Sequence, residues 1–130
     1  MPPFAAKMLP DSPDVLAPDG SEVRILVSGA GGSMAHFRLA PGAVAKPVRH
    51  RTVDELWYVT AGRGEIWRAQ DGREEITALV PGLALSIPLG TAFQFRAAAD
   101  ATLEIVGVTM PPWPGGDEAI PAQGRWAPTL

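Results

Sequence analysis

The sequence predicts an all-β fold, either a sandwich or a closed barrel, on the strength of three observations. Glycine and proline each occur 14 times in 130 residues, so turns interrupt the chain often. Between these turns lie short runs that are rich in β-branched and aromatic residues, as strands are. About nine such runs follow one another at short, regular intervals, which is the pattern of a sandwich or barrel.

The first three predicted strands follow a turn at Asp19-Gly20. Ser21 to Ser28 (SEVRILVS) is the first, and the glycine cluster Gly29 to Gly32 forms the next turn. Met34 to Leu39 alternates as a second strand, and a Pro-Gly pair ends it. The third run, Val48 to His50, is short and has polar neighbours.

The remaining strands begin with Glu55 to Thr60 (ELWYVT), which has the strongest strand composition in the chain. A glycine-containing turn leads to Glu65 to Ala69, so these two runs form a predicted hairpin. Asp71-Gly72 is a tight-turn dipeptide. Four further strands complete the set: Glu74 to Leu79, Ala84 to Ile87, Ala92 to Arg96 and Thr102 to Thr109.

Proline is concentrated at the two ends of the chain, so we divide it into three parts. Residues 1–20 hold five prolines and predict an extended tail, packed along the barrel edge or on a partner subunit. Residues 21–110 form the predicted barrel. Residues 111–130 begin with Pro-Pro-Trp-Pro-Gly-Gly and predict an irregular tail. Trp113 and Trp126 lie in this tail, and we expect both to be packed against other groups.

Composition excludes several classes of protein. The net charge is −3 without any basic run, so no nucleic-acid partner is expected. Cysteine is absent, which rules out disulfides and cysteine-based metal sites. No apolar run is long enough to span a membrane, and the proline-rich start does not resemble a signal peptide. We therefore expect a cytoplasmic protein with no membrane partner.

Two segments carry a resemblance to the cupin superfamily. The first cupin motif, G-x5-H-x-H-x3,4-E-x6-G, is matched at four positions: Gly42, His50, Glu55 and Gly62. The second motif, G-x5-P-x-G-x2-H-x3-N, is matched at three positions: Gly82, Pro88 and Gly90. The glycine and proline spacings are the specific part, because each marks a turn that the barrel must make. The closing segment is similar to that of small bacterial single-domain cupins of the cupin-2 type.

The resemblance implies a double-stranded β-helix, or jelly-roll, barrel with a site for a small molecule. It does not imply a particular reaction, because one fold hosts many activities. Typical cupins bind a divalent metal with three histidines and one glutamate. Here Val48 and Phe93 stand at two of the histidine positions, and Ala97 replaces the asparagine of the second motif. Only His50 and Glu55 remain, so we predict no metal or other cofactor.

The chain has one other histidine, His36, and this leaves a metal-dependent alternative open. If His36 faced the barrel interior, then His36, His50 and Glu55 would form a ligand set like that of Fe(II) dioxygenases. Strand alternation places His36 on the face opposite Phe37, without fixing which face is interior. The other interpretation makes His36 a surface or interface residue.

Without a metal, His50 and Glu55 are the candidate catalytic residues. Burial raises the pKa of a carboxyl and lowers that of an imidazole, whereas mutual attraction does the reverse. Such a pair can act as general acid and base in an isomerase or cyclase. An alternative is a relic pair in a non-enzymatic binding or sensor module. We expect the pocket to be lined by Val48, Trp57, Phe93, Phe95 and Arg96.

The expected partners are an unidentified small molecule and a second copy of the chain. The homodimer prediction rests on the apolar strand set and on the tryptophan-containing tail.

Overall fold

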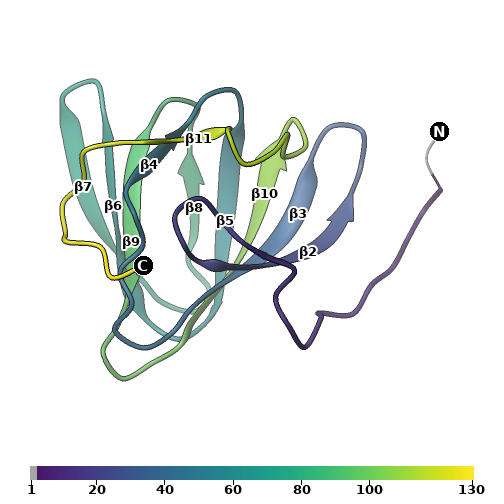
Figure 1. Cartoon of the computed structure of the whole chain (residues 1–130), viewed down its shortest axis with the longest axis horizontal. Helices are drawn as coiled ribbons and strands as arrows, with labels where there is room; N and C mark the ends of the chain where they lie inside the picture. The colour runs from purple at the N-terminus through teal and green to yellow at the C-terminus, as the bar shows by residue number, and fades with distance from the viewer. Residues whose placement is uncertain (1–2) are drawn as a thin grey trace.

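The computed structural model describes residues 3–130, and every regular element within this range is a β-strand. Two antiparallel sheets face each other (Figure 1). The order of the first sheet is β1-β2-β3-β10-β5-β8, and that of the second is β11-β4-β9-β6-β7. The predicted all-β fold is therefore confirmed. Residues 3–130 contain no helix of the length and apolar character that crossing a membrane requires.

The nine predicted strands all form, with boundaries within one residue of the prediction. They are β2 (Glu22–Ser28), β3 (Ser33–Leu39), β4 (Val48–His50), β5 (Asp54–Ala61), β6 (Gly64–Gln70), β7 (Arg73–Leu79), β8 (Ala84–Ile87), β9 (Ala92–Ala97) and β10 (Leu103–Met110). Two very short strands lie in the segments that were expected to be irregular. β1 (Val15–Leu16) pairs with β2, and β11 (Ala119–Pro121) pairs with β4. Both are edge strands, where proline is tolerated next to or within the pairing.

The glycines of the two motifs occupy turns that other residues would strain. Gly62 follows β5 with a φ of 80°, and Gly82 precedes β8 with a φ of 94°. A Cβ atom at Gly62 would also collide with the backbone carbonyl of Thr102. These turns set the register between neighbouring strands, which is why the spacing of the glycines was informative.

The interior of the barrel changes character along each strand. At one end, inward side chains such as Leu39, Val59 and Ile105 are fully buried and form the hydrophobic core with residues of the second sheet. Towards the other end of the same strands, Phe37, Trp57 and Gly107 line a cavity instead. Alternation along the strands thus places core residues and cavity residues on one continuous face.

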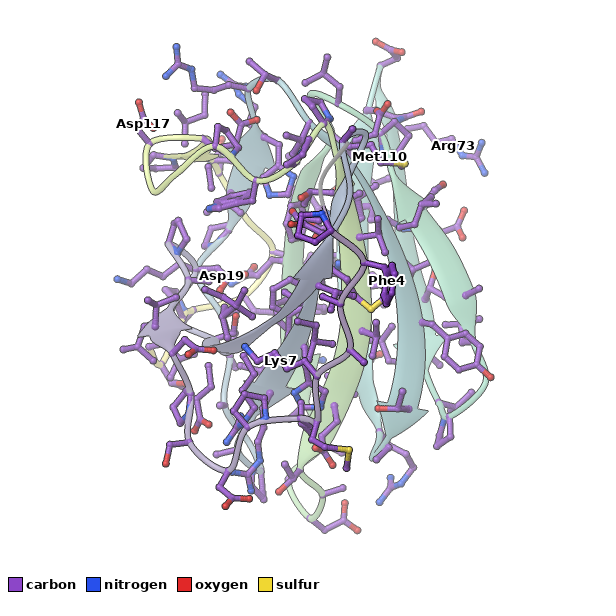
Figure 2. The ribbon with its side chains drawn as sticks, turned by 90° about the vertical axis from the view of Figure 1, so that its right-hand side faces the viewer. Phe4, Lys7, Asp19, Arg73, Met110 and Asp117 are labelled. Atoms are coloured by element: carbon purple, nitrogen blue, oxygen red, sulfur yellow. The ribbon has the colours of Figure 1, made fainter. Side chains whose placement is uncertain are left out.

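Both terminal segments are held against the barrel by specific hydrogen bonds. In the view of Figure 2 the N-terminal segment passes in front of the strands; its residues 3–9 are exposed, and Lys7 Nζ donates to the Ile25 carbonyl at 2.6 Å. The C-terminal segment is tied by Gln94, which is fully buried. Its amide oxygen accepts from the backbone N–H groups of Arg125 and Trp126, and its nitrogen donates to the carbonyls of Ala45 and Trp126.

Candidate functional site

A cavity of about 540 Å³ lies at the open end of the barrel. Its walls come from β2, β3, β4, β5, β9 and β10, and from both terminal segments. Most of the lining is hydrocarbon or aromatic, and the ionisable side chains among the described lining residues are Asp19, His50 and Glu55. A mostly apolar concavity with a few convergent polar groups is the usual form of a small-molecule site.

His50 enters the cavity from β4, and aromatic rings hold it in place. The imidazole is 6% exposed and makes edge-to-face contacts with Phe93 and Trp113, each with ring centroids 5.3 Å apart. Its Nδ1 atom has no hydrogen-bond partner among the described residues. Burial lowers the pKa of His50, and the charge of Glu118 opposes this shift only in part.

Glu55 lies beside His50 and is 3% exposed. Its Oε1 atom is 3.7 Å from His50 Nδ1, which is too long for a hydrogen bond. Burial raises the pKa of Glu55 to about 8. Two neighbours act on this pKa in opposite directions: the Trp57 indole lowers it, and the charge of Asp19 raises it further. The Trp57 N–H is nevertheless outside hydrogen-bond geometry with any described residue. Glu55 is therefore protonated and His50 neutral at neutral pH.

The absence of a side chain at Gly107 allows this arrangement. Gly107 pairs with Trp57 across β10 and β5. A Cβ atom there would lie 2.5 Å from Phe37 Cε2 and 3.2 Å from both Glu55 Oε2 and Trp57 Cδ1. A glycine in a central strand weakens the sheet, so its presence is typical of a place where other groups approach closely.

Three of the five side chains that we expected to line the pocket do so: Val48, Trp57 and Phe93. Phe95 and Arg96 do not. Phe95 faces the same way as Phe93 but lies one pleat deeper, in the core against Trp57 at a centroid distance of 4.9 Å. Arg96 points to the opposite face of β9.

On that face Arg96 is already engaged. Its Nη2 atom donates to Glu65 Oε1 at 2.6 Å, and its guanidinium lies 4.0 Å from the centroid of the Trp126 ring. Both tail tryptophans are thus packed, Trp113 on His50 and Trp126 under Arg96.

His36 lies outside the cavity. On β3, Ala35 and Phe37 line the cavity, so His36 faces the outer side of the sheet. Its Nε2 atom is 3.2 Å from Glu104 Oε1. Burial lowers the pKa of His36, and the neighbouring Glu104 opposes this shift. The proposed set of His36, His50 and Glu55 is therefore wrong, because the sheet separates its first member from the other two.

The donor set around His50 does not suit a catalytic metal of the usual cupin kind. Val48 and Phe93 contribute hydrocarbon where the resemblance would place histidines. Among residues 3–130, no group of three or more His, Cys, Asp or Glu side chains is arranged to hold a metal ion. Glu118, the carboxylate whose charge acts on His50, is occupied by the N–H groups of Thr52 and Val53 and by the Thr52 hydroxyl.

Sequence reasoning missed Asp19, because residues 1–20 were interpreted as a tail. Asp19 is 8% exposed and lines the cavity. Its Oδ1 atom accepts from the Ser21 N–H at 2.9 Å and from the Ser21 hydroxyl at 2.7 Å. Burial raises the pKa of Asp19. The Asp-Gly-Ser triplet signalled a turn, but nothing in the sequence indicated that the turn folds over the barrel mouth.

Comparison with protein families gives a match to the cupin domain over residues 35–109. Comparison with the curated proteins gives no match. Among solved structures, a variant of oxalate decarboxylase from Bacillus subtilis has a TM-score of 0.70 at 18% identity, over 78% of this chain and 28% of that one. Our chain therefore spans less than a third of that enzyme.

Two smaller structures are similar over most of their own length. KdgF from Halomonas sp. has a TM-score of 0.60 at 23% identity, over 71% of this chain and 81% of that one. A Klebsiella pneumoniae protein with a double-stranded β-helix domain has a TM-score of 0.64 at 15% identity, over 79% and 84%. Identities this low support the fold alone. Together with the family match, which covers more than half of the chain, they show that it belongs to the cupin family and has the double-stranded β-helix fold.

Proposed function

We propose that this chain is a cupin that binds a small organic molecule in its cavity and transfers protons on it without a metal, as an isomerase or cyclase does. The observation that carries the proposal is the group of buried polar atoms facing the cavity. Within residues 3–130, His50 Nδ1 and Trp57 Nε1 have no hydrogen-bond partner, and the Glu55 carboxyl lies beside them. Buried polar groups are almost always hydrogen-bonded, so unpartnered ones in a cavity favour a ligand that pairs with them.

The protonation states support acid–base chemistry. Because Glu55 is protonated and His50 is neutral at neutral pH, Glu55 is an acid and His50 is a base. His50 would take a proton from one atom of the ligand while Glu55 gives a proton to another. The ligand's bonds are rearranged, the proton gained by His50 is returned to Glu55 through solvent, and no co-reactant is consumed, which is the balance of an isomerisation or a cyclisation.

The lining also restricts the ligand. Among the described residues that line the cavity, none is lysine or arginine. Carboxylate and phosphate ligands are usually bound through such residues. We therefore propose that the ligand carries no strong anionic group, and that its body is apolar or aromatic to suit Val48, Trp57 and Phe93.

The test is a screen of neutral and cationic fragments by ligand-observed NMR, followed by proton exchange in D2O. We expect hits to bind the wild-type protein and to bind His50→Ala at least about tenfold more weakly, because the substitution removes one or two hydrogen bonds to the ligand. His36→Ala is the matched control, since it removes the other histidine outside the cavity. Hits that bind both variants equally would contradict the assignment of the site.

Deuterium incorporation separates an enzyme from a binding or sensor module. In the enzyme, a bound hit with an acidic C–H exchanges that hydrogen with D2O, and Glu55→Gln abolishes the exchange. In a sensor, hits bind with the same dependence on His50 and no exchange above the solvent rate occurs. The second result would keep the binding proposal and refute the catalytic one.

A further inference from the structure

Two buried carboxyl groups face the cavity, and no cationic side chain among the described lining residues balances them. Asp19 comes from the N-terminal segment and Glu55 from β5, and they are close enough that the charge of Asp19 acts on Glu55. Ser21 holds one oxygen of Asp19, which fixes the orientation of the carboxyl. Lys46 lies near Asp19 without lining the cavity, and His50 is the remaining ionisable group there.

Aromatic rings surround the same space. Trp57 is the centre of this group, with Phe37 and Phe93 each 5.9 Å from it between ring centroids. Trp113 completes the group beyond His50. Rings attract organic cations through their negatively charged faces, and this attraction is stronger where water is excluded. Two carboxyls and several rings around one cavity are complementary to a positive charge on an apolar body.

We propose that the ligand of this cavity is an organic cation, an alkyl or quaternary ammonium, bound by Asp19, Glu55 and the rings of Phe37, Trp57, Phe93 and Trp113. This inference rests on the proposed function, since it takes the cavity to be the ligand site. The ammonium supplies the positive charge that the described lining residues of the cavity lack. A second, independent feature points to a ligand here: Trp57 is buried, and its indole N–H has no hydrogen-bond partner among the described residues. Because this N–H is a donor, the ligand should also carry an acceptor such as a hydroxyl on its apolar body.

Proton release should accompany binding. Buried acids without a counter-charge remain protonated, and an adjacent cation favours their ionised form. Glu55 therefore gives up its proton when the cation is bound: to the ligand in the proposed reaction, and to solvent when the probe has no group basic enough to accept it, as a quaternary ammonium has none. Affinity should then rise with pH below the pKa of Glu55, by about tenfold between about pH 6 and pH 7 for one linked proton. Asp19, His50 and, more remotely, Lys46 and Glu118 are the other titratable groups around this region.

The experiment compares choline with 3,3-dimethylbutan-1-ol by isothermal titration calorimetry. The two probes have the same shape and hydroxyl group, and only choline is charged. Its charge does not titrate, so any pH dependence belongs to the protein. We expect choline to bind at least about tenfold more tightly than the alcohol, with the pH dependence above. Titrations in buffers of different ionisation enthalpy should give close to one proton released per choline.

Variants identify the residues that cause the preference for choline over the neutral alcohol. Glu55→Gln and Asp19→Asn keep shape and lose charge, so each should lower the preference for choline, and Glu55→Gln should also remove the pH dependence. Glu104→Gln is the control, because Glu104 pairs with His36 outside the cavity. Near-ultraviolet circular dichroism checks that each variant is folded.

Equal or tighter binding of the neutral alcohol would overturn the cation inference and leave the proposed small-molecule site in place. Failure of both probes to bind at millimolar concentration would overturn it as well. The fragment screen above then decides separately whether the proposed function stands.

Discussion

The two histidines of this chain form two His–Glu pairs that differ in what surrounds them. His36 and Glu104 lie on the outer face of the first sheet, 3.2 Å apart, and Glu104 is a third exposed. His50 and Glu55 lie in the cavity, 3.7 Å apart, and both are almost fully buried. The first pair is within hydrogen-bond distance and next to water, whereas the second is too far apart for a hydrogen bond and is enclosed by aromatic rings.

The contrast distinguishes a pair next to a fastened chain segment from the pair that we propose to be functional. Around His36, Arg24 is buried and fixed by the carbonyls of Pro10 and Asp11, so that this cluster fastens the N-terminal segment. Among the described residues, Nδ1 of both histidines lacks a hydrogen-bond partner, but His50 lines the cavity together with the equally unpartnered Trp57 indole, and His36 does not. Buried polar groups without partners lower the stability of the folded protein. Such groups are expected at a site where a ligand supplies the missing partners.

The largest expected effect is on stability and comes from Glu55→Gln. Because the pKa of Glu55 is raised to about 8, the folded state holds a proton that the unfolded state releases above its ordinary pKa. Stability from this group is thus lost as pH rises from about 4.5 to 8, by about 3 kcal/mol at pH 7. Glu55→Gln should be more stable than wild type by up to that amount in urea denaturation at pH 7. A loss of stability would mean that Glu55 is ionised and paired.

A smaller effect of opposite sign should follow Gln94→Ala, at a buried polar residue that is fully partnered. The change removes four hydrogen bonds that hold the C-terminal segment and leaves the Arg125 and Trp126 N–H groups without that acceptor. We expect a loss of about 2 kcal/mol or more in the free energy of unfolding. Limited proteolysis should cut near Gly124 faster in this variant, and an unchanged cleavage rate would contradict the tether.

Gly107→Ala tests how closely the groups around Glu55 are packed. The added methyl group would meet Phe37, Glu55 and Trp57, so the cavity floor must move. We expect a loss of about 1–3 kcal/mol in stability from overpacking, together with weaker ligand binding. The control is Gly31→Ala, a glycine with open space around its would-be Cβ. If both variants behaved alike, the close approach at Gly107 would have no consequence.

The homodimer stays a prediction, and we expect the smallest of these effects from disrupting it. Phe4 and Met8 of the N-terminal segment, and Leu56 and Tyr58 on the outer face of β5, are exposed apolar side chains. Light scattering at micromolar concentration should give about twice the chain mass of 13.7 kDa. The mass of a single chain would refute the prediction, and Leu56→Glu should shift a dimer towards monomer.

The strands were predictable because local chemistry decides them. Glycine and proline mark the turns, β-branched and aromatic residues fill the strands, and the motif spacing fixes the barrel. β1 and β11 were missed because two or three residues carry no periodic pattern. Their pairing depends on neighbours that are remote in the chain, β2 and β4.

The site was only partly predictable for the same reason. The prediction placed both Glu55 and Trp57 at the pocket, and they lie two residues apart on one face of β5. Alternation could not tell the depth of Phe95, nor which side of the sheet His36 would face, since those depend on how the sheets close. Asp19 and Trp113 enter the cavity from the terminal segments, whose path over the barrel is set by tertiary contacts such as the Ser33 hydroxyl accepting from the Trp113 N–H.

The protonation state of Glu55 tests the account most directly. Carbon-detected NMR of carboxyl-labelled glutamate, recorded from acid to alkaline pH, follows each glutamate separately, and Glu55→Gln identifies the signal of Glu55. We predict one glutamate that titrates near pH 8, absent from the variant, while the signal of Glu104 at the other pair persists in both. If every glutamate titrated below pH 5, the cavity pair would be an ordinary ion pair, and both the acid–base role and the linked proton release would be wrong.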